Sequence, residues 1–357
     1  MRPSRILFVA PPVGPIGSGE AGGVETHLIN LAPILVERGY KVGIVAPEGS
    51  VVPVMDVALH QVAGEMSRSA TRAKRNTRTA LRTGGVLENM WDEALRVQGE
   101  YDIVIGVSYD WLPFYLTSFF STPVGHWISI CSTIDEVDRI IEKRWREGGL
   151  ELAMYTRAQA ATYPFLQGGR IHFLYGGVDT AVFEYGGEPG DRLCWAARIS
   201  PEKGLEDAIA AARLLGLPLD VCGKIQDERY WRAVMEEASG VEIAYQGFLA
   251  PAELQRQYAG ARAMLVTPHW IEAFGNTVIE SMACGTPVVA FDRGGPAEII
   301  EHGRSGILVP QGDVDGLVRG VQAAMRLDRR VVRARAQEFT FARMADRLER
   351  WVEAVAG

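Results

Sequence analysis

Residues 264–291 read MLVTPHWIEAFGNTVIESMACGTPVVAF, and this stretch decides the fold. A short apolar run at 264–267 is followed by a loop, by helical periodicity at 278–283, and by a second apolar run at 288–291. Strand-sized apolar runs that alternate with helical patterns are typical of parallel sheets covered by helices on both faces. The stretch therefore predicts a strand, a helix and a strand of an α/β fold.

The same alternation extends along the whole chain and restarts near residues 175–179. We expect strands at 6–10, 42–46, 103–107, 124–130 and 171–174, and then at 193–196, 219–222, 243–245, 264–267 and 288–291, with helices between them as at 205–215 and 230–238. This pattern predicts two doubly wound, Rossmann-like domains, residues 1–175 and 176–338, with ligands bound in the interdomain cleft. We expect the amphipathic segment 339–357 to pack back on the first domain.

Composition excludes several classes of protein. The 357 residues are 47% apolar and 23% charged, which is typical of a globular protein, and the net charge of -7 disfavours a nucleic-acid binder. The longest apolar runs are strand-sized, so no transmembrane segment is predicted, and the N-terminus lacks the pattern of a secretion signal, so we expect a cytoplasmic protein. The four cysteines stand far apart, which favours buried thiols over a zinc site.

Two glutamates flank the predicted start of the helix after residue 275. Glu272 lies in the loop and Glu280 about one turn inside the helix, and the backbone N–H groups between them suit a phosphate. A ligand with a polyol, a diphosphate and a ribose fits this layout. Two solvated glutamates are the alternative.

Two other segments supply groups that suit phosphate. Arg198 and Lys203 follow the strand at 193–196, where they are placed to hold phosphate oxygens, although a solvated loop is the alternative. Gly22 and Gly23 precede a helix that opens near residue 24, and glycine lets the backbone approach an anion closely. The alternative there is a flexible surface loop.

The motifs A-R-x4-K-G at 197–204, E-x7-E at 272–280 and G-G-x2-E at 294–298 resemble those of the retaining, GT-B-fold glycosyltransferases of family four. The resemblance extends over nearly the whole chain. Residues 12–19 (PVGPIGSG) and 109–115 (YDWLPFY) further resemble segments of the cyanobacterial UDP-glucose:tetrahydrobiopterin glucosyltransferases.

The resemblance implies a role for each matching residue. Glu280 would hold the donor ribose, Arg198 and Lys203 would neutralise the diphosphate, and Glu272 would contact the transferred sugar. Gly22 and Gly23 would approach the donor phosphates. The donor-binding segment would also include Ala273, Phe274, Gly275, Asn276, Thr277 and Val278.

The first domain departs from the family at one catalytic position. The family has a histidine near the end of a strand, but counting from Pro123 places Ser129 there. Either His126 substitutes from an earlier point on the strand, or Ser129 and the loop 131–133 line the pocket without a histidine. A lone histidine in an apolar strand is otherwise a core residue. Asp110, after another strand, is a second candidate for acceptor binding.

No metal ion or other cofactor is expected, and a nucleotide sugar, UDP-glucose in the narrower resemblance, is the expected co-substrate. The single D-x-D string, at 313–315, follows a strand and precedes a helix, so we interpret Asp313 as a helix N-cap. The aromatic rings of Trp111, Phe114, Tyr115 and Trp127 are suited to a flat heterocycle such as a pterin, with ordinary core packing as the alternative.

Three functions stay open at this point. The first is a retaining hexosyltransferase with a small acceptor such as a tetrahydropterin. The second is the same chemistry on a lipid or polysaccharide at the membrane surface, for which a basic run would provide weak attraction if it is helical. The members of that run are Arg68, Arg72, Lys74, Arg75, Arg78 and Arg82. The third is a nucleotide-sugar-binding protein without activity. The sequence leaves the oligomeric state open.

Overall fold

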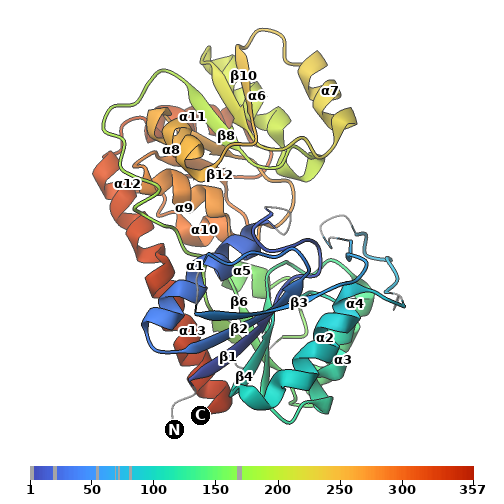
Figure 1. The fold of residues 1–357 in the computed structure, drawn as a ribbon. Helices are drawn as coiled ribbons and strands as arrows, with labels where there is room; N and C mark the ends of the chain where they lie inside the picture. Colours follow the sequence, from blue (N-terminus) through green and yellow to red (C-terminus); the bar gives the residue numbers. More distant parts are fainter. Residues whose placement is uncertain are drawn as a thin grey trace. The chain divides into compact units, whose positions relative to one another are not determined.

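The computed structural model describes residues 4–18, 22–53, 56–68, 70, 73–79, 83–166 and 171–357 (Figure 1). The chain divides into two compact units, which we describe separately. Unit 1 comprises Met1–Gly176 and Phe341–Gly357, and unit 2 comprises Gly177–Thr340.

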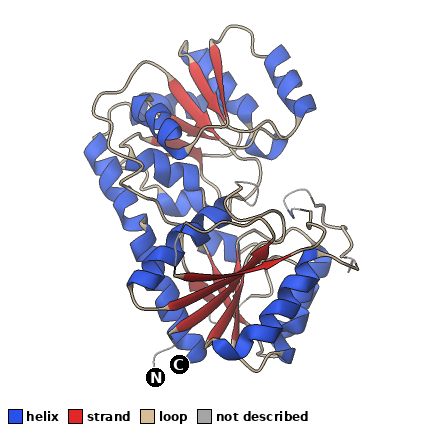
Figure 2. Ribbon diagram, viewed as in Figure 1, coloured by secondary structure: helices blue, strands red, loops and turns tan. Residues whose placement is uncertain are grey.

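Unit 1 is built on a parallel sheet, and strands are drawn in red in Figure 2. Its seven strands follow the order β3-β2-β1-β4-β5-β6-β7. The strands are β1 (Arg5–Val9), β2 (Lys41–Pro47), β3 (Val57–Val62), β4 (Ile103–Gly106), β5 (Val124–Ile128), β6 (Glu151–Met154) and β7 (Ile171–Phe173). The helices are α1 (Gly23–Glu37), α2 (Val86–Val97), α3 (Trp111–Leu116), α4 (Asp135–Arg146), α5 (Arg157–Ala160) and α13 (Phe341–Ala356), with short 3-10 turns η2 (Gln98–Glu100) and η3 (Thr117–Phe119). The central strands are buried, as their apolar sequences require.

The last helix of the chain, α13, completes unit 1. It contacts α1, β4 and β7, and it buries an apolar stripe that includes Phe341, Leu348 and Trp351. The Trp351 ring packs so closely on β5 that a Cβ atom at Gly125 would lie 2.7 Å from it. The amphipathic periodicity of this segment is therefore matched by a buried face.

Unit 2 contains a second parallel sheet, of six strands in the order β10-β9-β8-β11-β12-β13. The strands are β8 (Leu193–Ala196), β9 (Leu219–Cys222), β10 (Ile243–Gly247), β11 (Met264–Val266), β12 (Val288–Phe291) and β13 (Gly306–Val309). The helices are α6 (Leu205–Leu215), α7 (Glu228–Glu236), α8 (Pro251–Gly260), α9 (Asn276–Ala283), α10 (Gly295–Ile299), α11 (Val314–Ala324) and α12 (Arg329–Ala336), with 3-10 turns η4 (Pro201–Lys203) and η5 (Gln337–Phe339). The expected pair of Rossmann-like sheets is confirmed.

The two ends of unit 2 lie side by side. The Val178 N–H donates to the Phe339 carbonyl at 2.8 Å, and Val178 and Thr340 form an isolated parallel bridge. One backbone contact thus joins the first and last turns of a segment of more than 150 residues.

Two strands of unit 1, β3 and β6, are absent from the sequence-based expectation. The Asp313 N-cap is confirmed, because its carboxylate accepts from the Gly316 N–H at 2.7 Å at the start of α11. Within the basic run, Arg72 and Arg82 lie outside the described residues, and the described residues 73–79 form no helix. Among the described residues, no helix has both the length and the apolar character needed to cross a bilayer.

Candidate functional site

The loop 267–275 joins β11 to α9 and contains Glu272. Helix α9 begins at Asn276, as expected, and its N-cap is Gly275, which has φ 107° and therefore favours glycine. Among the described residues, no side chain caps this helix by a hydrogen bond. The Val278 N–H donates to the Gly275 carbonyl at 3.0 Å. The positive end of the helix dipole at this terminus favours an anion.

Glu272 lies against Lys203, a residue from the loop after β8. The Lys203 Nζ donates to Glu272 Oε2 at 2.5 Å, and the two side chains are only 13% and 20% exposed. Trp270 joins the pair, since its Nε1 donates to Glu272 Oε2 at 2.9 Å and its ring lies 4.6 Å from the Lys203 Nζ. We call Lys203, Trp270 and Glu272 the Lys203 cluster.

The electrostatics of this cluster keep Glu272 ionised. Burial acts to raise the pKa of Glu272, but the charge of Lys203 and the hydrogen bonds from Lys203 and Trp270 outweigh burial. The charge of Arg198 adds to the same effect, and the pKa of Glu272 ends below its ordinary value. The cluster therefore presents a carboxylate and an ammonium together.

Arg198 lies near the cluster on the same loop. Its Nη1 donates to Gln226 Oε1 at 2.7 Å, and its Nη2 lies 3.9 Å from the Glu202 carboxylate. Its side chain is 37% exposed. Arg198 is thus oriented by a neutral amide and remains accessible to phosphate oxygens.

Two glycine loops position these side chains by close backbone contacts. Gly204 has φ 63°, and a Cβ atom there would lie 2.0 Å from the Thr267 carbonyl oxygen, so the Lys203 loop packs directly on the end of β11. Gly294 has φ 69°, and a Cβ atom there would lie 2.5 Å from the Glu272 carbonyl oxygen. The Gly295 N–H donates to that same carbonyl at 2.8 Å. Only glycine allows this approach.

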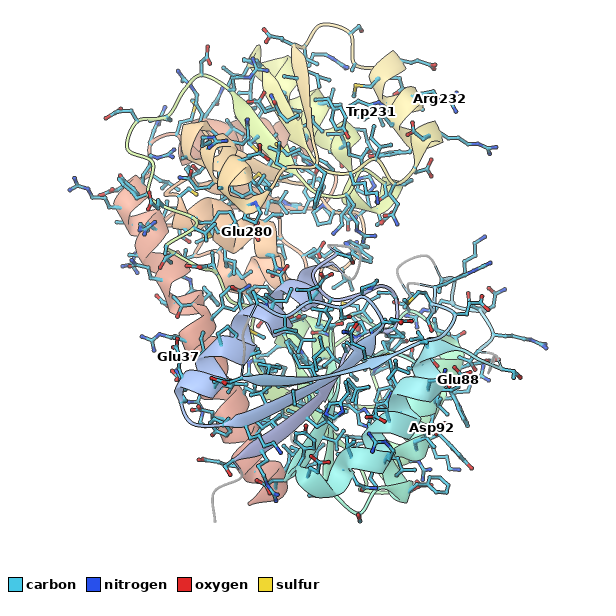
Figure 3. The ribbon with its side chains drawn as sticks, in the orientation of Figure 1. Glu37, Glu88, Asp92, Trp231, Arg232 and Glu280 are labelled. Atoms are coloured by element: carbon cyan, nitrogen blue, oxygen red, sulfur yellow. The ribbon has the colours of Figure 1, made fainter. Side chains whose placement is uncertain are left out.

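Glu280 lies inside α9 (Figure 3). The Tyr258 hydroxyl is 3.4 Å from its Oε2. Burial raises the pKa of Glu280 to about 7, an effect that the Tyr258 hydrogen bond only partly offsets. A partly buried carboxyl group with one long hydrogen bond is suited to accept hydrogen bonds from ligand hydroxyls.

In unit 1, Gly22 and Gly23 lie at the start of α1. Gly22 is the N-cap with φ 74°, and Gly23 is the first helical residue. The loop before them is tied by Glu25, whose buried carboxylate accepts from the Gly17 N–H at 2.5 Å. Residues 19–21 lie outside the described residues, and Gly19 is the last residue of the segment 12–19 that resembles the pterin glucosyltransferases.

His126 is a core residue of unit 1. It is fully buried in β5, its ring lies 4.4 Å from the Phe114 ring and 6.1 Å from the Trp91 ring, and its Nε2 pairs with the Thr117 hydroxyl at 2.8 Å. Burial lowers its pKa to about 3, so the imidazole is neutral. This placement favours the interpretation of His126 as a core residue over its interpretation as a substitute for the histidine of the family.

Asp110 caps α3 by accepting from the Leu112 N–H at 3.4 Å, and burial raises its pKa. Ser129 follows the end of β5 and is half-buried. Among the aromatic candidates, Trp127 and Phe114 belong to the core, whereas Trp111 stacks on Tyr115 at 4.7 Å and Tyr115 is 39% exposed.

The structure brings Lys203 and Glu272 into contact, with Arg198 near them, but it gives no direct contact of these residues with Glu280. Sequence reasoning missed Trp270 and Gln226. Trp270 lies within residues 264–291, two positions before Glu272. This closeness in sequence to a candidate carboxylate was the signal that could have pointed to Trp270.

The comparisons with known proteins bear on unit 2 first. Residues 187–339 match the family described as "Glycosyl transferases group 1". The D-inositol 3-phosphate glycosyltransferase of Pseudarthrobacter chlorophenolicus is 27% identical over 355 residues, which span 85% of this chain and 81% of that protein. The alpha-maltose-1-phosphate synthase of Mycolicibacterium smegmatis is 30% identical over 171 residues, 42% of this chain and 44% of that protein.

A solved structure extends the similarity to the whole fold. Anabaena Alr3699/HepE in complex with UDP-glucose superposes with a TM-score of 0.68 at 19% identity, covering 96% of this chain and 97% of that one. Together, the matches show that the chain has the GT-B fold and that residues 187–339 are similar to the group 1 glycosyltransferases.

Proposed function

We propose that this chain, in which residues 187–339 match the group 1 glycosyltransferases, is a retaining glycosyltransferase that moves a hexose from a nucleotide sugar to a small acceptor. The observation that carries this proposal is the Lys203–Glu272 pair, which combines a buried ammonium and an ionised carboxylate on loops that flank the uncapped start of α9. The ammonium and the helix N-terminus are suited to bind the phosphates of the donor, and the carboxylate is suited to bind the hydroxyls of its sugar.

The chemistry of such a transfer assigns roles to these groups. The bond between the anomeric carbon and the phosphate oxygen breaks, and its electron pair stays on the diphosphate. The acceptor oxygen bonds to the carbon, and its hydroxyl proton passes to the leaving diphosphate. Arg198, Lys203 and the segment 273–278, at the positive end of the α9 dipole, stabilise the negative charge of the leaving diphosphate. Glu272 stabilises the cationic sugar and holds its hydroxyls, and Glu280 holds the ribose.

For the donor we propose UDP-glucose, used without a metal ion. The UDP-glucose complex of Anabaena HepE, a protein of the same fold, makes this the donor to test first. Arg198 and Lys203 supply the positive charge that a metal ion would otherwise provide. Chelator is therefore expected to leave the rate unchanged.

For the acceptor, two small molecules have support. The relatives named D-inositol 3-phosphate glycosyltransferase favour a phosphorylated polyol. The stacked pair Trp111 and Tyr115, with Tyr115 39% exposed, favours a flat heterocycle such as a tetrahydropterin. We propose that Asp110, Ser129 and this pair, all in unit 1, bind the acceptor. The cytoplasmic location remains a prediction.

The first experiment is a donor and acceptor panel, read by release of nucleoside diphosphate with and without chelator. We expect turnover of a nucleotide hexose with one of the two small acceptors. E272Q should lower kcat by about a hundredfold while the nucleotide still binds, because one charge is lost from the site of the sugar cation. R198A should raise the donor KM, because a cation that contacts phosphate is lost.

Matched variants control for changes of surface charge. R232A removes an arginine of α7, and E37Q removes an exposed carboxylate at the end of α1; both residues are labelled in Figure 3. Both variants should keep wild-type rates. Tight nucleotide-sugar binding without transfer to any acceptor would favour the binding-protein alternative. Transfer that requires anionic vesicles would favour the membrane-surface alternative.

A further inference from the structure

Trp270 contacts both charged members of the Lys203 cluster. Its indole N–H donates to Glu272 Oε2 at 2.9 Å, and the face of its ring lies 4.6 Å from the Lys203 Nζ. Lys203 Nζ also donates to Glu272 Oε2, at 2.5 Å, so the three side chains close a triangle. Trp270 is half-buried, and this keeps its ring beside Lys203 and Glu272.

The hydrogen bonds leave one carboxylate oxygen for a ligand. Within the described part of the chain, both Lys203 and Trp270 bond to Oε2 of Glu272, and Oε1 receives no hydrogen bond from a described residue. A carboxylate fixed through one oxygen presents the other in a defined direction. Preorganised groups of this kind need no rearrangement when charge develops in the transition state.

The ring has a different effect on Lys203. An aromatic face attracts an ammonium without neutralising it, and the ammonium has three N–H groups, of which Glu272 takes one. With respect to the residues that the structure describes, Lys203 therefore has N–H groups left for phosphate oxygens.

We propose that Trp270 is a positioning residue that holds the Glu272 carboxylate and the Lys203 ammonium in their working arrangement before the donor binds. This inference rests on the proposed function, because it takes Glu272 as the residue that contacts the transferred sugar. The indole N–H fixes the orientation of the Glu272 carboxylate, and the ring face fixes the position of the Lys203 ammonium.

Two substitutions separate the N–H from the ring. W270F keeps an aromatic face and removes the donor, so kcat should fall about tenfold, the effect of losing one hydrogen bond to a charged group, while the donor KM stays within about twofold. W270L removes both, so the donor KM should rise as well, because Lys203 loses its aromatic partner. W231F is the matched control, since Trp231 of α7 packs on Tyr245 and lies well away from Glu280 in Figure 3.

The pH profile provides a readout that loss of packing would not change. Without the indole N–H the pKa of Glu272 should rise, so the acid limb of kcat in W270F should move to higher pH, whereas W231F should match the wild type. In the E272Q background, W270F should cause little further loss, because the N–H acts through the carboxylate.

The inference is overturned if W270F leaves kcat and the acid limb unchanged, or if its effect adds in full to that of E272Q. If W270L does not fold, W270F decides alone. If the wild type transfers no sugar and binds no nucleoside diphosphate, the proposed function fails instead. NMR titration of Glu272 in the free protein then tests the positioning role separately, and an equal pKa in W270F and wild type would overturn it.

Discussion

Glu280 combines burial with the proposed role of binding the donor ribose through its carboxylate. Burial raises its pKa to about 7, with the Tyr258 hydroxyl as a partial offset. Between about pH 4.5 and 7 the unfolded chain loses this proton while the folded chain keeps it, so rising pH lowers the free energy of unfolding by about 1.4 kcal/mol per pH unit. The protein therefore has its full free energy of unfolding below about pH 4.5 with respect to this group, and loses part of it as the pH rises to about 7.

E280Q should remove this dependence. Glutamine has no proton to lose, so E280Q should be more stable than the wild type at pH 8 by on the order of 3 kcal/mol and similar to it at pH 4. Urea unfolding at both pH values measures the difference, with E37Q as the exposed control. Parallel pH curves for E280Q and wild type would contradict it. Nucleotide binding should weaken in the same variant.

At the residue scale, the sequence supplied the candidate side chains but not their contacts. The positions of Arg198, Lys203, Glu272 and Glu280 followed from local patterns next to strand ends. The contact of Lys203 with Glu272 joins residues 69 positions apart, and no local pattern encodes it. His126 shows the converse, since an apolar strand pattern is compatible with both a site and a core position.

Among the elements, the Gly294 turn offers a direct test of how the Glu272 loop is held. Gly294 and Gly303 both have a positive φ, 69° and 77°, but a Cβ atom would meet the Glu272 backbone at the former and nothing within 4 Å at the latter. G303A should cost about 1–2 kcal/mol from its left-handed conformation. G294A should cost about 2 kcal/mol more, because backbone must move.

Chemical denaturation of the two variants measures this difference, and turnover measures its consequence. G294A should also lower kcat, because the displaced backbone belongs to Glu272, while G303A should not. Equal denaturation midpoints for the two variants would show that the contact is not tight.

The strands that sequence reasoning missed have a common cause. Strand β6, Glu151–Met154, reads ELAM, and all four residues are better helix formers than strand formers. It is a strand because it pairs with β5 on one side and β7 on the other. Strand β3 mixes polar and apolar residues at the edge of the sheet. Tertiary pairing therefore overrides local preference in both.

For the whole molecule, the α/β class and the two parallel sheets were predictable, because the strand–helix rhythm repeats across hundreds of residues. The return of α13 to unit 1 makes a further prediction. Trp351 is fully buried against β5, so W351A should cost unit 1 about 3–5 kcal/mol. If the units unfold separately, calorimetry should show one transition lowered and the other unchanged.

UDP should raise the unfolding temperature of unit 2. A ligand at a hundred times its Kd stabilises the unit that binds it by about 2.7 kcal/mol, so UDP should raise the transition that W351A leaves unchanged. A shift confined to the transition of unit 1 would contradict the assignment of the donor to unit 2.

The bridge of Val178 with Thr340 has a consequence for genetic dissection. Because the ends of unit 2 are neighbours, residues 177–340 form an insertion within the chain of unit 1, with entry and exit at one point. A short linker from residue 176 to residue 341 would join the two parts of unit 1 in one chain. The excised segment, residues 177–340, would keep its two ends paired through the bridge. The bridge therefore marks the two positions at which the chain would be cut to separate the units.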